Sequence, residues 1–215
     1  MPTTHPPVDS PLPAEFLQRL AELERAYLRE TDPIKQSGFS GGAERWHAER
    51  SPILNAIPTS GSLLDVGCAN GYLLECLLQW ACERGVTLTP FGVDCSAGLI
   101  ELARERLPMF RDHFHVADAS AWIPPRRFQY VYSVFDCVPQ SALGDFVEHL
   151  LSQVVAPGGR LILGAYGSRS RREVPARLDE LLANLGHVVA GSAVAGVPET
   201  ARFIWIDAAA GLIKL

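Results

Sequence analysis

Cysteine is scarce in this sequence, and the five cysteines present include no C-x-x-C pair of the kind that binds zinc or carries out redox chemistry. An odd number of thiols without such spacing is typical of a reducing compartment, so we expect a cytoplasmic protein. His113 and His115 flank the start of one expected strand, but no cysteine and no convincing carboxylate partner accompanies them at ligand spacing. The sequence therefore predicts no metal site.

Basic residues are also few. The 19 Lys and Arg residues are outnumbered by 24 Asp and Glu residues, which gives a formal net charge of −5. Long-range attraction to nucleic acid or anionic lipid is therefore absent from the composition. Short arginine clusters near residues 126 and 171 are the features that favour RNA, although such runs beside turns are usually solvated. We expect a small-molecule partner, with nucleic acid disfavoured, and a homodimer is left open.

The N-terminal segment has no long hydrophobic run. Residues 1–13 hold five prolines and resemble neither a signal peptide nor a membrane anchor. We interpret them as a disordered lead-in and expect no membrane partner. At 215 residues the chain is long enough for one domain. We expect a helical cap with a glycine-rich lid over residues 14–57, and a core over residues 58–215.

Two helical segments are expected in the cap. Apolar residues recur at helical spacing over residues 14–30, which gives that helix one apolar face. A second helix is expected over residues 43–57, with a break at Pro52. Between them, residues 36–42 have too much backbone freedom for regular structure. We interpret this glycine-rich segment as a lid over a bound ligand, with a plain linker as the alternative.

The remainder of the chain alternates short apolar runs with helical patterns, which indicates right-handed βαβ units and a parallel sheet. Strands are expected at residues 63–66, 90–94, 114–117, 130–134 and 160–165, and helices at 73–84, 97–107, 142–155 and 172–185. Residues 187–191 and 201–207 are strand-like without a helix between them, which predicts an antiparallel hairpin at one sheet edge. The expected fold is α/β, a doubly wound, mostly parallel seven-stranded sheet with helices on both faces and an N-terminal helical cap.

The first of these strands runs into a turn of small residues and then a helix. Residues 65–71 read Asp-Val-Gly-Cys-Ala-Asn-Gly, and small residues let a ligand approach the backbone where open α/β sheets bind their ligands. Asp94 and Asp118 end the next two strands, where carboxylates can accept hydrogen bonds from ribose hydroxyls and from an adenine edge. Each feature alone also fits a tight turn or a solvated loop acid. Together they describe one nucleoside-shaped site.

This ordered set of motifs resembles the class I S-adenosylmethionine-dependent methyltransferases over about residues 62–207. The resemblance implies S-adenosylmethionine as cofactor and S-adenosylhomocysteine as product. It places Gly67, Cys68 and Gly71 along the methionine portion, Asp94 on the ribose, and Asp118 with Ala119 on the adenine. The full set of expected cofactor-binding residues is Asp65, Gly67, Cys68, Ala69, Asn70, Gly71, Asp94, Cys95, Asp118, Ala119 and Ser133.

Two positions depart from the family pattern. Ala69 stands where the family usually has a glycine, and Gln129 stands where an acid is often found, so no catalytic role is carried onto Gln129. A different class, the NAD-dependent oxidoreductases, would need glycines at Ala69 and Tyr72. An RNA or protein methyltransferase of the same fold, and a cofactor-binding protein without catalysis, stay open.

Two side chains are candidates for catalysis. Asp136 follows the fourth strand, and could orient a methyl acceptor or take its proton. His47 follows the glycine-rich segment and could act as a base near neutral pH. Either side chain fits a structural role equally well, Asp136 as a helix cap and His47 in packing or at the surface. The sequence thus predicts a methyltransferase whose small-molecule acceptor it does not identify.

Overall fold

The structure is a computed structural model that describes residues 12–168 and 171–210. The predicted lead-in therefore lies, up to residue 11, outside the described residues. The described part holds a seven-stranded sheet in the order β3-β2-β1-β4-β5-β7-β6. The strands are β1 Gly61–Val66, β2 Leu88–Asp94, β3 Phe114–Val116, β4 Phe128–Val134, β5 Val155–Tyr166, β6 Gly191–Ala195 and β7 Ala201–Asp207. The first five are parallel, and β7 runs antiparallel to β5 and β6, which confirms the predicted fold class.

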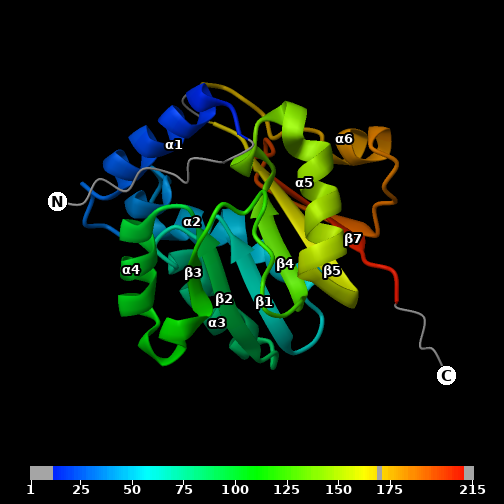
Figure 1. Cartoon of the computed structure of the whole chain (residues 1–215), viewed down its shortest axis with the longest axis horizontal. Coiled ribbons are helices and arrows are strands. Elements are labelled where there is room, and N and C mark those ends of the chain that lie inside the picture. Colours follow the sequence, from blue (N-terminus) through cyan, green and yellow to red (C-terminus); the bar gives the residue numbers. More distant parts are fainter. Residues whose placement is uncertain (1–11, 169–170, 211–215) are drawn as a thin grey trace.

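Helices cover both faces of the sheet, as Figure 1 shows. The α-helices are α1 Ala14–Tyr27, α2 Ala43–Arg50, α3 Tyr72–Glu83, α4 Ala97–Arg106, α5 Leu143–His149 and α6 Leu178–Asn184. Short 3₁₀ turns are η1 Lys35–Ser37, η2 Ser51–Ala56, η3 Pro108–His113, η4 Phe135–Cys137 and η5 Gln140–Ala142, and a π turn, η6 Leu150–Val154, extends α5. Residues of α5 and α6 pack on one face, and residues of η2, α3 and α4 pack on the other. No helix among the described residues is long and apolar enough to cross a membrane.

Several expected boundaries were wrong, among them the start of β5, which was expected at residue 160 and lies at Val155. The helix expected over residues 172–185 begins only at Leu178, because Glu173 pairs with Ser168 through two backbone hydrogen bonds of 2.9 Å and Pro175 follows. The strand expected over residues 187–191 begins only at Gly191, because the His187 amide caps α6 by donating to the Leu182 carbonyl at 2.9 Å. The helix expected to reach residue 155 ends before Val155, where β5 starts.

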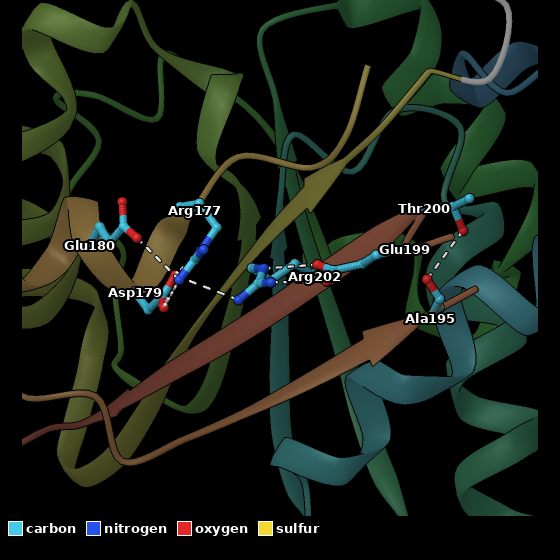
Figure 2. A network of polar contacts seen from close by, with 7 residues as sticks. All are labelled: Arg177, Asp179, Glu180, Ala195, Glu199, Thr200 and Arg202. Atoms are coloured by element: carbon cyan, nitrogen blue, oxygen red, sulfur yellow. Dashed lines mark hydrogen bonds and ion pairs between the residues drawn. The ribbon is translucent and has the colours of Figure 1, made fainter. Parts of the chain in front are cut away.

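A polar network fixes the terminal hairpin to α6, as Figure 2 shows. Arg202 on β7 donates to both carboxylate oxygens of Glu199, at 2.8 and 2.9 Å, and lies 3.5 Å from the Asp179 carboxylate on α6. Thr200 closes the hairpin loop by donating to the Ala195 carbonyl at 3.3 Å. These contacts hold β6 and β7 at the edge of the sheet that the sequence predicted.

The N-terminal helix α1 covers the site side of the sheet without burying any residue completely. It lies beside α4, where Ser96 Oγ donates to Glu24 Oε1 at 2.6 Å and Leu28 contacts Gly98. The glycine-rich segment that follows it forms the single turn η1 and then an irregular stretch, and Phe39 within it is buried. Part of the segment expected to be irregular is therefore a 3₁₀ turn.

Candidate active site

Strand register brings the ends of four strands to one level. Val66 of β1 pairs with Val93 of β2 and with Ser133 of β4, and Asp94 pairs with Val116 of β3. Because parallel strands end at the same sheet edge, the residues that follow them gather there. The structure thus brings together the strand-end motifs that the sequence singled out.

The turn after β1 adopts the left-handed backbone that its small residues allow. Gly67 has φ +79°, Ala69 φ +46° and Gly71 φ +72°. A Cβ at Gly67 would lie 2.7 Å from Cys137 Sγ, and one at Gly71 would lie 3.2 Å from the Ala103 backbone, so both positions require glycine. Ala69 tolerates a conformation that favours glycine, as the departure from the family pattern implied.

A cavity of about 320 Å³ opens above this turn, beneath α1. Its walls come from α1, from α2 and from the ends of β1, β2, β4 and β5. Nine of the expected site residues line it: Asp65, Gly67, Cys68, Ala69, Asp94, Cys95, Asp118, Ala119 and Asp136. The strand-end acids and the turn therefore line one cavity, which α1 partly covers.

Three expected cofactor residues support the turn and do not line the cavity. Asn70 Nδ2 donates to the Pro33 carbonyl and to Gln36 Oε1, both at 3.0 Å. Gly71 packs on α4, and Ser133 Oγ is buried with donation to the Val134 carbonyl at 3.1 Å. Contact with a ligand in this cavity is therefore not supported for these residues, and we assign them to positioning.

His47 is likewise not brought to the cavity. It lies on the exposed side of α2, where its ring packs edge-on against Trp80 with centroids 4.7 Å apart. Trp46 and Arg50, which are one helical turn apart on α2, line the cavity instead. The geometry supports a packing role for His47 and does not support its role as a base.

The Asp94 carboxylate is held in place by backbone amides of two nearby residues. Its Oδ2 accepts from the Ala69 amide and its Oδ1 from the Ser96 amide, both at 2.9 Å. Burial raises the pKa of this carboxyl, and the two amide hydrogen bonds oppose the rise. Each oxygen keeps a further lone pair for a ligand hydroxyl. Asp118 is held in a similar way, because its Oδ1 accepts from the Ser120 amide and hydroxyl at 2.9 and 2.7 Å.

Asp65 and Arg50 are buried ionisable side chains at the cavity wall. Burial, reinforced by the nearby Asp94 charge, raises the pKa of the Asp65 carboxyl to about 8. Arg50 is 7% exposed, and its Nη1 makes no hydrogen bond within the described residues. The Glu49 carboxylate lies 3.7 Å from that nitrogen, but Glu49 also accepts from Arg45 Nε at 2.7 Å. A buried guanidinium and a buried carboxyl thus face a ligand-sized space.

Aromatic rings hold the Arg50 guanidinium in place. Its central carbon lies 4.2 Å from the ring centroid of Phe39, 4.1 Å from that of Trp46 and 4.3 Å from that of Tyr166. The Tyr166 hydroxyl is 2.8 Å from that of Tyr132. Burial raises the pKa of the Tyr166 phenol. The Arg50 charge opposes this rise and the Asp65 charge adds to it, so the Tyr166 hydroxyl is close enough to both side chains to be affected by them. Sequence reasoning missed Arg50, although a tryptophan and an arginine at positions i and i+4 were visible.

The thiols in the cavity are poor nucleophiles. Burial raises the pKa values of the Cys95 and Cys137 thiols to about 12, and raises that of Cys68 well above its ordinary value. Protonated thiols do not attack carbon centres efficiently at neutral pH. The described residues also contain no group of three or more His, Cys, Asp or Glu side chains arranged to hold a metal.

Comparison with known proteins agrees with this geometry. Residues 63–159 match the family described as "Methyltransferase domain". A trans-aconitate 2-methyltransferase from Rhodopseudomonas palustris (strain HaA2) is 35% identical over 102 residues, which cover 46% of this chain and 36% of that protein. The match thus spans about a third of that relative's length.

Solved structures share the fold across most of the chain. DhpI in complex with S-adenosylhomocysteine has a TM-score of 0.62 at 18% identity, covering 90% of this chain and 97% of that one. The family match over residues 63–159 and the shared fold support a class I S-adenosylmethionine-dependent methyltransferase. A Burkholderia thailandensis 1,6-didemethyltoxoflavin-N1-methyltransferase, with substrate and S-adenosylhomocysteine bound, has a TM-score of 0.60 at 16% identity, covering 94% of both chains. These matches support the resemblance to S-adenosylmethionine-dependent methyltransferases that the sequence indicated.

Proposed function

We propose that this methyltransferase transfers the methyl group of S-adenosylmethionine to a small-molecule acceptor held in the cavity under α1. The observation that carries the proposal is the juxtaposition of Asp65, Asp94 and Asp118 at three strand ends around one cavity. Taken in chain order, Asp65 would bind the ammonium group of the cofactor, Asp94 its ribose and Asp118 its adenine. Asp94 would accept from the ribose hydroxyls, and Asp118 with Ala119 would contact the adenine.

The methionine end of the cofactor is a zwitterion, and the cavity offers one partner for each of its charges. Arg50 Nη1 is buried without a hydrogen bond in the described residues and has only a 3.7 Å ion pair there, with Glu49, so a ligand carboxylate would supply the hydrogen bond. Asp65 would pair with the ammonium group and ionise in doing so. The ring contacts on Arg50 fix the guanidinium before binding, which reduces the entropy cost of ordering it.

When bound, the cofactor supplies an electrophilic methyl group on a sulfonium. The acceptor's lone pair forms the new bond to that carbon while the carbon–sulfur bond breaks and its electron pair stays on sulfur. The chain's contribution is alignment and exclusion of water by α1 and the strand ends. Asp136 lines the cavity beside Cys137 and Val138, and would take or orient the acceptor's proton.

A small acceptor is supported by the enclosure of the site. The helix α1 covers the cavity, and Leu17, Leu20 and Tyr27 of that helix form its roof. The named substrates of the relatives, trans-aconitate and 1,6-didemethyltoxoflavin, are also small molecules. We further propose the cytoplasm as the place of action, because all five cysteines are free thiols.

The proposal is tested by calorimetry with S-adenosylmethionine and S-adenosylhomocysteine, together with a transfer assay using methyl-labelled cofactor and a metabolite panel. Arg50→Gln is expected to weaken S-adenosylhomocysteine binding by about tenfold to a hundredfold, the range for a charge-assisted hydrogen bond. The matched control is Arg84→Gln, whose Nη1 contacts only Asn55 Oδ1 at 3.5 Å on the surface. Absence of binding by the unmodified protein would refute the proposed function.

A further inference from the structure

The charged side chains around the cavity are mostly acidic. The acids among the lining residues are Glu24, Asp65, Asp94, Asp118 and Asp136, and the cations are Arg19 and Arg50. No lysine or histidine belongs to the lining within residues 12–168 and 171–210. Under the proposed function Arg50 holds the cofactor carboxylate, so Arg19 is the cation that remains for an acceptor. Arg19 is exposed on α1 and lies 5.5 Å from the ring centroid of Phe16.

Two carboxylates face the part of the cavity beneath α1. Asp136 follows β4, and Glu24 on α1 accepts from Ser96 Oγ at 2.6 Å. Their region includes the Tyr27 phenol, whose pKa is raised by burial first and then by the Asp136 and Asp94 charges. A carboxylate placed here would lose hydration and meet like charges, and both effects oppose its binding.

The roof over the same space is apolar. Leu17, Leu20 and Leu23 of α1 line the cavity, yet none of them is buried. Leu17 packs on the core cluster that contains Val138, whereas Leu20 and Leu23 are not among the described residues that pack on that cluster. An amphipathic helix normally buries its apolar face against a partner surface, so a ligand that covers these leucines would supply the missing burial.

We propose that the acceptor is an apolar, uncharged or cationic molecule with one hydroxyl or amine group directed at Asp136, and that polycarboxylates are excluded. The inference rests on the proposed function and narrows its substrate class. It separates this chain from the matched relatives, because trans-aconitate carries several carboxylates and would face Asp136 and Glu24 with only Arg19 to offset them. The hydroxyl or amine would donate its hydrogen bond to the Asp136 carboxylate.

The experiment is calorimetry on the full chain saturated with S-adenosylhomocysteine, using four probes: 2-naphthol, tryptamine, 1-naphthoate and trans-aconitate. 2-Naphthol and 1-naphthoate share the naphthalene ring but differ in the position, charge and hydrogen-bond donation of one substituent, so the change of their affinity ratio in an Asp136 variant reports the preference of Asp136 for a neutral donor over a carboxylate. We expect 2-naphthol and tryptamine to bind at least about tenfold more tightly than 1-naphthoate, and trans-aconitate to bind no more tightly than 1-naphthoate. Asp136→Asn is expected to bring the 2-naphthol and 1-naphthoate affinities to within about threefold of each other.

The matched control is Asp145→Asn, which removes an exposed carboxylate of α5 outside the cavity and should leave the probe ratio unchanged. Tighter binding of trans-aconitate than of 2-naphthol would overturn the inference, as would failure of both 2-naphthol and tryptamine to bind. Loss of S-adenosylhomocysteine binding would instead count against the proposed function, and it is measured before any probe is added. The two failures are therefore distinguishable.

Discussion

The side-chain amide of Asn70 donates a 3.0 Å hydrogen bond to Gln36 Oε1, across 34 residues of sequence. The same nitrogen donates to the Pro33 carbonyl at 3.0 Å, and Gln36 Nε2 donates to the Glu30 carbonyl at 2.8 Å. Asn70 and Gln36 are both buried. The turn after β1 is therefore tied directly to the first residue of the glycine-rich segment.

Removing this connection should destabilise the protein. Asn70→Ala leaves the Pro33 carbonyl and the Gln36 side chain without their shared donor in a buried place. We expect the free energy of unfolding to fall by about 1–3 kcal/mol, measured by urea denaturation. The control is Asn55→Ala, whose side chain is exposed and accepts only a 3.5 Å hydrogen bond from Arg84. A loss in Asn70→Ala no larger than in the control would show that the link contributes nothing.

Asp94 is expected to bind the cofactor's ribose. Asp94→Ala removes two charge-assisted acceptors, so affinity for S-adenosylhomocysteine should fall by about tenfold to a hundredfold in calorimetry. Because Asp94 also accepts from the Ala69 and Ser96 amides, circular dichroism and a melting curve must show that the variant is folded. Asp112→Ala, at an exposed position in η3, is the matched control. Unchanged affinity in a folded Asp94→Ala variant would remove Asp94 from the site.

Asp65 should make stability depend on pH. Its folded pKa of about 8 lies above the ordinary value of 3.8, so the folded state prefers the protonated form. The stabilising contribution is complete below pH 3.8 and is lost as pH rises through about 8. Asp65→Asn removes this titration. As pH rises from 3.8 to about 8, the free energy of unfolding of the unmodified protein should therefore fall relative to that of the variant. Denaturation at several pH values measures it, and a constant difference would contradict the assigned shift.

The same carboxyl should release a proton on cofactor binding. Near neutral pH the free carboxyl is mostly protonated, and an ammonium group beside it would favour the ionised form. We expect release of roughly one proton per cofactor bound, seen as a dependence of calorimetric enthalpy on the buffer's ionisation enthalpy. Asp65→Asn should reduce that release to near zero. Equal proton release by both proteins would show that Asp65 is not the group concerned.

The strand ends could be predicted from the sequence because each depends on a local pattern. The apolar run before Asp65 and the small residues after it define both the strand and the turn, and Asp94 and Asp118 follow by the same rule. Arg50 could not be found in this way, because its burial depends on Phe39 and Tyr166, which meet it only in the folded chain. The position of His47 outside the cavity lining could not be predicted either, because helical phase decides which side of α2 faces the cavity.

The glycine-rich segment, residues 36–42, remains a predicted lid, and its contacts explain how cofactor binding would order it. Phe39 is 8% exposed and lies under the Arg50 guanidinium, while Ser37 lines the cavity. If Arg50 binds the cofactor carboxylate, the Arg50 guanidinium stays fixed over the Phe39 ring. Opening of the segment would then cost part of the cofactor's binding free energy, because it would separate Phe39 from Arg50. A plain linker has no such connection to the ligand.

Hydrogen exchange with and without S-adenosylhomocysteine separates a lid from a linker. The Gly38 and Phe39 amides donate to the Lys35 and Ile34 carbonyls at 3.0 and 3.3 Å, so they report opening of the segment. At a ligand concentration of roughly 100 Kd we expect their exchange to slow by at least about tenfold. The amides of β6, at the far edge of the sheet, serve as the internal control for global stabilisation. Equal exchange of the Gly38 and Phe39 amides in the free and saturated protein would mean that residues 36–42 are only a linker between α1 and α2.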